Sequence, residues 1–243
     1  MLNQINHWIE YAAAGIDLVL LLRVLTLRLQ RTYVFLTLAC ALAVIFDVAS
    51  LLYAEEQFPR VWIYSELFSA LIFPLAVWDI FEEIASSVAA LRRLAIMRTL
   101  ASLIIISFFG LLWLTSVSQS DDPTGLSFLF ALTLIVSTGS AAGCLGFLWI
   151  MHRGLTLQKI LTPKNTTVWM IFYALLMVGQ IASWLVLIAE ETISQPARDT
   201  FSPIANLVLN FFGMVITVWC AFRLRGLPKD IPSPVSETEP PSK

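Results

Sequence analysis

Apolar residues run along this chain in stretches of about twenty, separated by short polar breaks. A helix rises about 1.5 Å per residue, so about 20 apolar residues are needed to cross the hydrocarbon core of a bilayer. Seven stretches meet this requirement, which predicts an all-α, polytopic membrane protein built as a seven-transmembrane-helix bundle. The predicted spans are about 8–27, 33–53, 61–81, 99–117, 126–150, 168–189 and 201–222.

The polar breaks predict where these helices end. Asp121, Asp122 and Pro123 form a turn signal before the fifth span, and 190–199 forms another, with Pro196 inside it. The membrane domain is therefore expected to occupy 1–225. Segment 226–243 is rich in proline and poor in apolar groups, so it cannot bury enough surface to fold and is predicted to be a disordered cytoplasmic tail.

The composition is that of a protein whose main solvent is lipid. Hydrophobic residues make up 58% of the chain, charged residues make up 13%, and the mean hydropathy is +0.80. A soluble domain of this length needs a larger charged shell. We therefore expect the lipid bilayer to be the main partner, with the chain spanning the cell (plasma) membrane several times.

Lysine and arginine predict the orientation of the bundle. When the connections are numbered alternately outside and inside, thirteen of the fifteen basic residues fall on one side, and Arg60 and Arg198 fall on the other. Basic residues gather on the cytoplasmic side of membrane proteins. This asymmetry places the N-terminus outside and the C-terminus in the cytoplasm.

A weak internal repeat relates the two ends of the domain. Three short segments recur in order: RVLTL at 23–27 as RGLTL at 153–157, DVAS at 47–50 as QIAS at 180–183, and AEE at 54–56 as AEE at 189–191. Spans one to three then match spans five to seven, a 3+1+3 parallel repeat with its pseudo-twofold axis along the membrane normal. Carriers built from such repeats bind substrate between the halves. The alternative is chance similarity between two amphiphilic hairpins.

Polar side chains within the spans are the candidate functional residues, because such groups are costly in a bilayer. Six of them fall at similar depths in the outer half, and helical spacing directs them into the bundle: Asp17, Asp47, Glu66, Gln180, Asn206 and Asn210. We expect them to line an outward-opening cavity for a ligand or ion. A carboxyl group removed from water favours its protonated form, so one of them could carry a proton or bind a cation. The alternative is hydrogen bonding that joins helices, worth about 1 kcal/mol per bond.

A second acidic group lies at the inner end of the third span. Asp79, Glu82 and Glu83 are followed by Arg92 and Arg93 in the next connection. This pattern predicts a solvated cluster of ion pairs.

The sequence lacks the residues that several kinds of cofactor and catalytic site require. A retinal Schiff base requires a lysine inside the bundle, and all four lysines fall outside the spans. Haem normally needs axial histidines, but His7 and His152 fall at opposite membrane faces. The sequence has no paired Cys/His ligand set and no nucleophile elbow. We expect no cofactor, no metal, no catalytic set and no nucleic-acid partner.

These observations favour a small-solute or proton-coupled transporter with an acidic cavity. One alternative is a non-catalytic subunit or assembly factor of a membrane complex, with a membrane protein as partner. Another is a receptor-like sensor without retinal. Enzymatic activity is the least supported, since no catalytic motif is present.

Overall fold

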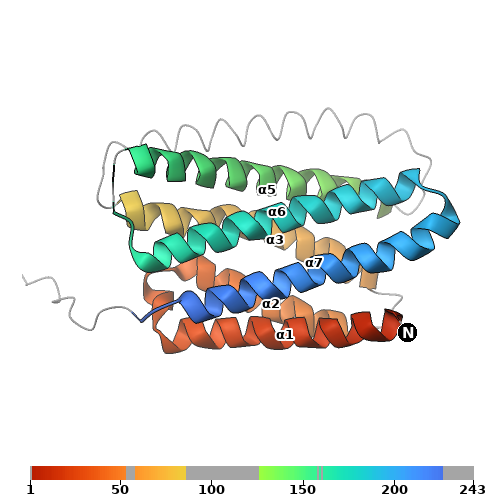
Figure 1. Cartoon of the computed structure of the whole chain (residues 1–243), viewed down its shortest axis with the longest axis horizontal. Coiled ribbons are helices and arrows are strands. Elements are labelled where there is room, and N and C mark those ends of the chain that lie inside the picture. The colour runs from red at the N-terminus through yellow and green to blue at the C-terminus, as the bar shows by residue number, and fades with distance from the viewer. Residues whose placement is uncertain (1, 53–57, 86–125, 158, 160, 227–243) are drawn as a thin grey trace, which may run out of the picture.

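A computed structural model describes residues 2–52, 58–85, 126–157, 159 and 161–226, and every regular element in these ranges is a helix. The elements are α1 (Leu2–Thr26), a 3₁₀ turn η1 (Leu29–Arg31), α2 (Val34–Leu52), α3 (Phe58–Ala85), α5 (Leu126–Leu157), α6 (Lys164–Thr192) and α7 (Gln195–Arg223), as Figure 1 shows.

Six of the predicted spans fall on these six helices. The fourth, 99–117, lies outside the described residues, and so does the predicted tail after residue 226. The break predicted at 190–199 is too wide, because α6 continues to Thr192 and α7 already begins at Gln195. Pro196 stands in the first turn of α7, where its missing N–H leaves no intrahelical bond unmade, so it starts a helix instead of marking a loop.

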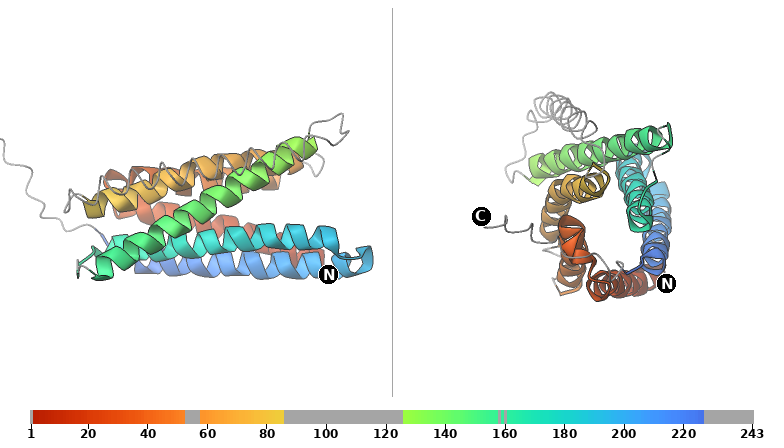
Figure 2. Two further views of the ribbon diagram at one scale, coloured as in Figure 1. Left: turned by 90° about the horizontal axis from the view of Figure 1, so that it is seen from above. Right: turned by 90° about the vertical axis from the view of Figure 1, so that its left-hand side faces the viewer.

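The six helices form a closed ring around a common axis (Figure 2). Each packs against two neighbours, in the order α1, α2, α3, α5, α6, α7 and back to α1. The pairs α3–α5 and α7–α1 run in the same direction, and the other neighbours are antiparallel. A weaker contact joins α3 to α6 across the ring, where Phe73 meets Tyr173 edge-on.

Described basic residues gather at one end of the ring, which we call the basic end. It holds the connection 27–33, residues 159 and 161–163, and the end of α7, with Arg23, Arg28, Arg31, Arg153, Lys159, Lys164, Arg223 and Arg225. Arg60 and Arg198 lie near the starts of α3 and α7, at the opposite end. The partition on which the predicted orientation depends is therefore present, and the membrane side that each end faces stays a prediction.

The helix surfaces indicate a membrane protein. In the described ranges, four segments are long and apolar enough to cross a bilayer: Val34–Leu52, Leu132–Leu157, Lys164–Glu190 and Gln195–Arg223. Large apolar side chains also point away from the ring on several helices, among them Leu71, Leu185, Val208 and Phe222. Such an apolar exterior suits lipid better than water.

Several fully buried apolar side chains of the core lie toward the basic end. Val24, Leu29, Leu36, Ile80 and Trp169 come from five different elements, and each is 0% exposed. Together they fill the interior of the ring near its basic end. The core is therefore closed on the basic-end side of the cavity described next.

Candidate ligand cavity and polar clusters

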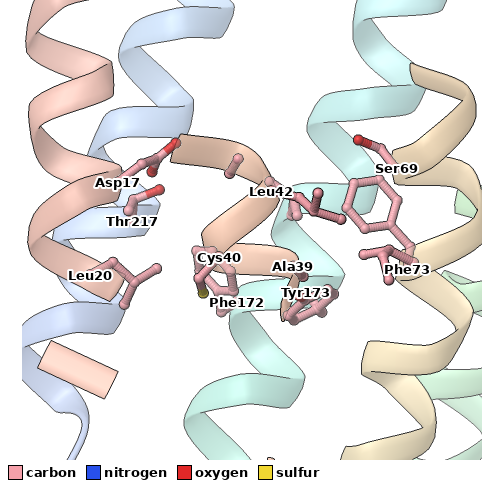
Figure 3. Close-up of a pocket in the computed structure, with 13 residues that line it drawn as sticks. Asp17, Leu20, Ala39, Cys40, Leu42, Ser69, Phe73, Phe172, Tyr173 and Thr217 are labelled. Carbon is pink, nitrogen blue, oxygen red and sulfur yellow. The ribbon is translucent and has the colours of Figure 1, made fainter. Parts of the chain in front are cut away.

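A cavity of about 150 Å³ lies inside the ring and is lined by α1, α2, α3, α6 and α7 (Figure 3). Most of its wall is apolar or aromatic, from Leu20, Ile72, Phe73, Phe172, Tyr173 and Leu176. Asp17, Ser69 and Thr217 supply its polar side chains. Asp17 and Leu20 are three positions apart on α1, so helical periodicity turns both toward the ring axis.

Asp17 forms a carboxyl pair with Asp47 of α2. The two carboxyl groups lie within hydrogen-bonding reach of each other, and Asp17 also lies within reach of Thr217 of α7. An ionised carboxylate can only accept hydrogen bonds, so two carboxyl groups bond to each other only when one of them carries a proton. Oδ2 of Asp47 is buried and makes no hydrogen bond in the structure. A hydrogen bond between these two carboxyl groups would therefore require one proton, and Asp47 Oδ2 would remain an unused acceptor.

Glu66 lies at the centre of a second cluster, which joins α3, α5 and α6. The Ser137 hydroxyl donates to Glu66 Oε2 over 2.9 Å, and the Gln180 amide donates to the same oxygen. Ser137 Oγ in turn accepts from Gln180 Nε2 at 3.1 Å and from the Trp184 indole N–H at 3.4 Å. Ser137 and Trp184 are almost fully buried. Each residue of this Glu66 cluster thus satisfies another inside the bundle.

A third group consists of Asp79, Glu83, Tyr33 and Thr166. We call these four residues the basic-end lock. Asp79 Oδ2 accepts a hydrogen bond of 2.9 Å from the backbone N–H of Leu36, in the first turn of α2. The first N–H groups of a helix have no intrahelical partner and carry partial positive charge, so a carboxylate there caps the helix. Glu83 accepts hydrogen bonds from the Tyr33 and Thr166 hydroxyls.

The prediction that these acids are solvated is wrong for Asp79 and Glu83, whereas their predicted ion pairs with Arg92 and Arg93 stay a prediction. Asp79 is 7% exposed and Glu83 is half-buried, and both bind groups of α2 and α6 inside the bundle. Arg92 and Arg93 lie outside the described residues. One local signal points to this contact: Tyr33, at the start of the second span, has no short side-chain acceptor that could cap the helix, so the cap must come from another element.

The end of α7 is tied to α6 and α1 through main-chain groups. Asn165 makes two hydrogen bonds to main-chain atoms of Arg225. Its Nδ2 donates to the Arg225 carbonyl at 2.8 Å, and its Oδ1 accepts from the Arg225 N–H at 2.9 Å. The Arg23 guanidinium reaches the Leu224 carbonyl at 3.5 Å. These contacts close the ring at the basic end.

The structure divides the six predicted cavity residues among three places. Asp17 lines the cavity and Asp47 is bonded to it. Glu66 and Gln180 bind each other in their own cluster. Asn206 and Asn210 are exposed on α7. They precede Thr217 by eleven and seven positions, hence on the same helix face but further from the basic end. One chamber shared by all six is therefore not the observed arrangement.

Metal binding finds little support in the described part of the chain. No three His, Cys, Asp or Glu side chains come together there in a set able to hold an ion. Cys40, Cys144 and Cys220 are buried free thiols on α2, α5 and α7. The polar groups on which a function can rest are the carboxyl pair, the Glu66 cluster and the basic-end lock.

Comparison with known proteins adds nothing to these groups as a basis for inferring a function. No protein-family model matches the chain, and neither a curated protein nor a solved structure shows significant similarity to it.

Proposed function

We propose that this chain is a multi-pass membrane carrier for a small solute, coupled to protons through Asp17 and Asp47. The observation that carries the proposal is the pairing of two carboxyl groups, Asp17 and Asp47, with Asp17 in the wall of a cavity inside a ring of helices. Ionisable residues inside a bilayer usually mark a pathway for a substrate, an ion or a proton. The pair can hold a proton or release it, as coupling requires.

Access to the cavity is expected from one side at a time. The packed core and the basic-end lock close the basic end, where Glu83 binds Tyr33 and Thr166. Asn206 and Asn210 lie on the cavity-facing side of α7 and are exposed, which favours a water-accessible approach from the opposite end. With the basic end in the cytoplasm, the arrangement is an outward-facing state of a carrier.

The order of helices in the ring supports the proposed 3+1+3 duplication. A twofold rotation that exchanges α1, α2 and α3 with α5, α6 and α7 maps the ring onto itself. The parallel contact α3–α5 then becomes the parallel contact α7–α1, and both are present. Carriers with parallel repeats rock their two halves about a site on this axis.

The inward faces of α2 and α6 add residue-level support for the duplication. Six positions that face the ring axis or its polar groups are matched at a constant separation of 133: Tyr33 with Thr166, Leu36 with Trp169, Ala39 with Phe172, Cys40 with Tyr173, Ala43 with Leu176, and Asp47 with Gln180. The first pair is in direct contact, hydroxyl to hydroxyl at 3.3 Å. Equivalent residues meet where a twofold axis passes between them, so this contact fits an axis at the basic-end lock.

The two polar clusters occupy equivalent positions in this scheme. The carboxyl pair joins α1, α2 and α7, and the Glu66 cluster joins α5, α6 and α3. Asp47 and Gln180 are the matched members. One copy is an acid pair able to exchange a proton, whereas the other is a satisfied network, so we assign coupling to the first half and helix packing to the second.

Proteoliposomes with a trapped pH-sensitive dye test the proposal. We expect that at least one solute from a panel of small amines, acids, alcohols and sugars will move protons across the membrane when added outside. Asp17→Asn and Asp47→Asn should abolish that movement. Glu10→Gln, on an exposed residue of the same helix as Asp17, should retain it. A panel without any response, or a response that survives both aspartate variants, would overturn the proposal.

A further inference from the structure

We infer that the cavity binds a small organic cation with an apolar body, which displaces the proton shared by Asp17 and Asp47. The inference rests on the proposed function, because it names the solute class that the carrier would accept. It is drawn from the shape of the cavity, from the placement of its polar groups and from the charges around Asp17.

The cavity has a carboxyl group on one side, and its other side is mainly aromatic with Ser69 as its polar group. Figure 3 shows Asp17 next to Thr217 on one side, and Phe73 on the other side with Phe172 and Tyr173 between them. A ligand that fits this wall has a polar head and an apolar body. The volume of about 150 Å³ matches that of an engineered cavity in another protein that holds benzene, so a body of about one ring is the expected size.

The charges around Asp17 select a cation. From α2 it faces Asp47 and Cys40, from α7 it faces Thr217, and across the cavity lie Ser69 of α3 and Tyr173 of α6. None of these groups is positively charged at neutral pH, so an anion would meet repulsion and a neutral molecule would leave the carboxylate unpaired. A cation would neutralise it, and aromatic walls favour cations further.

Binding and proton release are then one exchange. The pair with its shared proton carries one negative charge. An ammonium ion that binds to it takes the place of that proton, which leaves to water, and the pair becomes a dianion beside one bound cation. The net charge of the site falls by one when the proton leaves and rises by one when the ammonium enters, so the exchange is balanced. The cation and the proton therefore compete for the same carboxyl groups.

Calorimetry on the detergent-solubilised full chain tests this inference with three ligands of nearly the same shape: benzylammonium, benzyl alcohol and benzoate. We expect benzylammonium to bind at least tenfold more tightly than benzyl alcohol, and benzoate to show no binding. Titrations in two buffers of different ionisation enthalpy should reveal about one proton released per cation bound. Equal affinity for benzylammonium and benzyl alcohol, or binding without proton release, would overturn the inference.

Three variants keep the test decisive. Asp17→Asn should abolish cation binding, and Ala43→Leu, which narrows the cavity without touching the acids, should weaken it at least tenfold. Glu10→Gln should bind like the original chain. If Ala43→Leu and Asp17→Asn are both folded and bind normally, the ligand sits elsewhere and the inference fails. Cation binding without proton movement in liposomes would contradict the carrier alone, whereas proton movement with other solutes and no cation binding would contradict the solute class alone.

Discussion

Tyr33 and Thr166 lie 133 positions apart in the chain, with their hydroxyl oxygens 3.3 Å apart, and both donate to the same oxygen of Glu83. This contact joins the start of α2, the first turn of α6 and the last turns of α3 at the basic end. Tyr33 and Thr166 are 0% exposed, so no water competes for these bonds. In the proposed carrier this lock must open when the cavity is exposed to the cytoplasm.

Weakening the lock should loosen the basic end. Tyr33→Phe removes one donor to Glu83, and we expect it to lower the free energy of unfolding by about 1–3 kcal/mol, the usual cost of leaving a buried polar group short of a partner. Thermal unfolding in detergent measures this. Tyr64→Phe is the matched control, because Tyr64 is exposed, and a similar loss in both variants would show that the lock contributes nothing.

The cap on α2 should be detectable at individual amides. Asp79→Ala leaves the Leu36 N–H without its acceptor, so the first turn of α2 should exchange its amide hydrogens faster and the protein should lose about 1 kcal/mol or more. Hydrogen–deuterium exchange followed by mass spectrometry tests it. Glu82→Ala, on an exposed neighbouring residue, should leave the exchange unchanged, and unchanged exchange in Asp79→Ala as well would contradict the cap.

The Asn165 clamp should hold the last residues of α7. Its two bonds to Arg225 involve main-chain atoms, so Asn165→Ala removes both while the Arg225 side chain stays the same. Loss of about 1 kcal/mol at this site corresponds to roughly fivefold faster exchange of the Arg225 amide. The same exchange experiment reports it, and Arg225→Ala is the control that should keep the amide protected.

Variants of Glu66 distinguish a role of its cluster in packing from a role in transport. Glu66→Leu leaves the Ser137 and Gln180 donors without their acceptor and should destabilise the bundle by about 1–3 kcal/mol. Glu66→Gln keeps the shape of the side chain and should cost less. Because we assign this cluster to packing, solute-driven proton movement should persist in every Glu66 variant that folds, and its selective loss in Glu66→Gln would show that the cluster acts in coupling.

The sequence predicted the helices well where a single physical requirement decided them. Apolar length identified the six described helices, since a bilayer-spanning helix needs about 20 apolar residues. The predicted start of α7 is wrong, because Pro196 is typical of a loop but is also favoured in the first turn of a helix, where the structure has it. The fourth predicted span lies outside the described residues.

The polar groups were predicted less well, because their partners depend on how the helices turn toward one another. Asp79 caps a helix that begins 45 positions earlier in the chain, with its side chain directed to α2. Asp79 and Glu83 are four positions apart and so share one face of α3, but no local pattern indicates which helix they meet. Likewise, Glu66 and Gln180 were expected to line a cavity with Asp17, and the ring instead brings them onto Ser137 of α5.

The proposed carrier requires that Asp17 and Asp47 share one proton and release it when the cavity takes a solute. Infrared difference spectroscopy measures this directly, since a protonated carboxyl group has a carbonyl stretch that a carboxylate lacks. At neutral pH we predict such a band in the original chain and in Glu10→Gln, its absence in a folded Asp17→Asn variant, and its disappearance when benzylammonium is added. A band that survives in Asp17→Asn, or that benzylammonium leaves unchanged, would contradict the account.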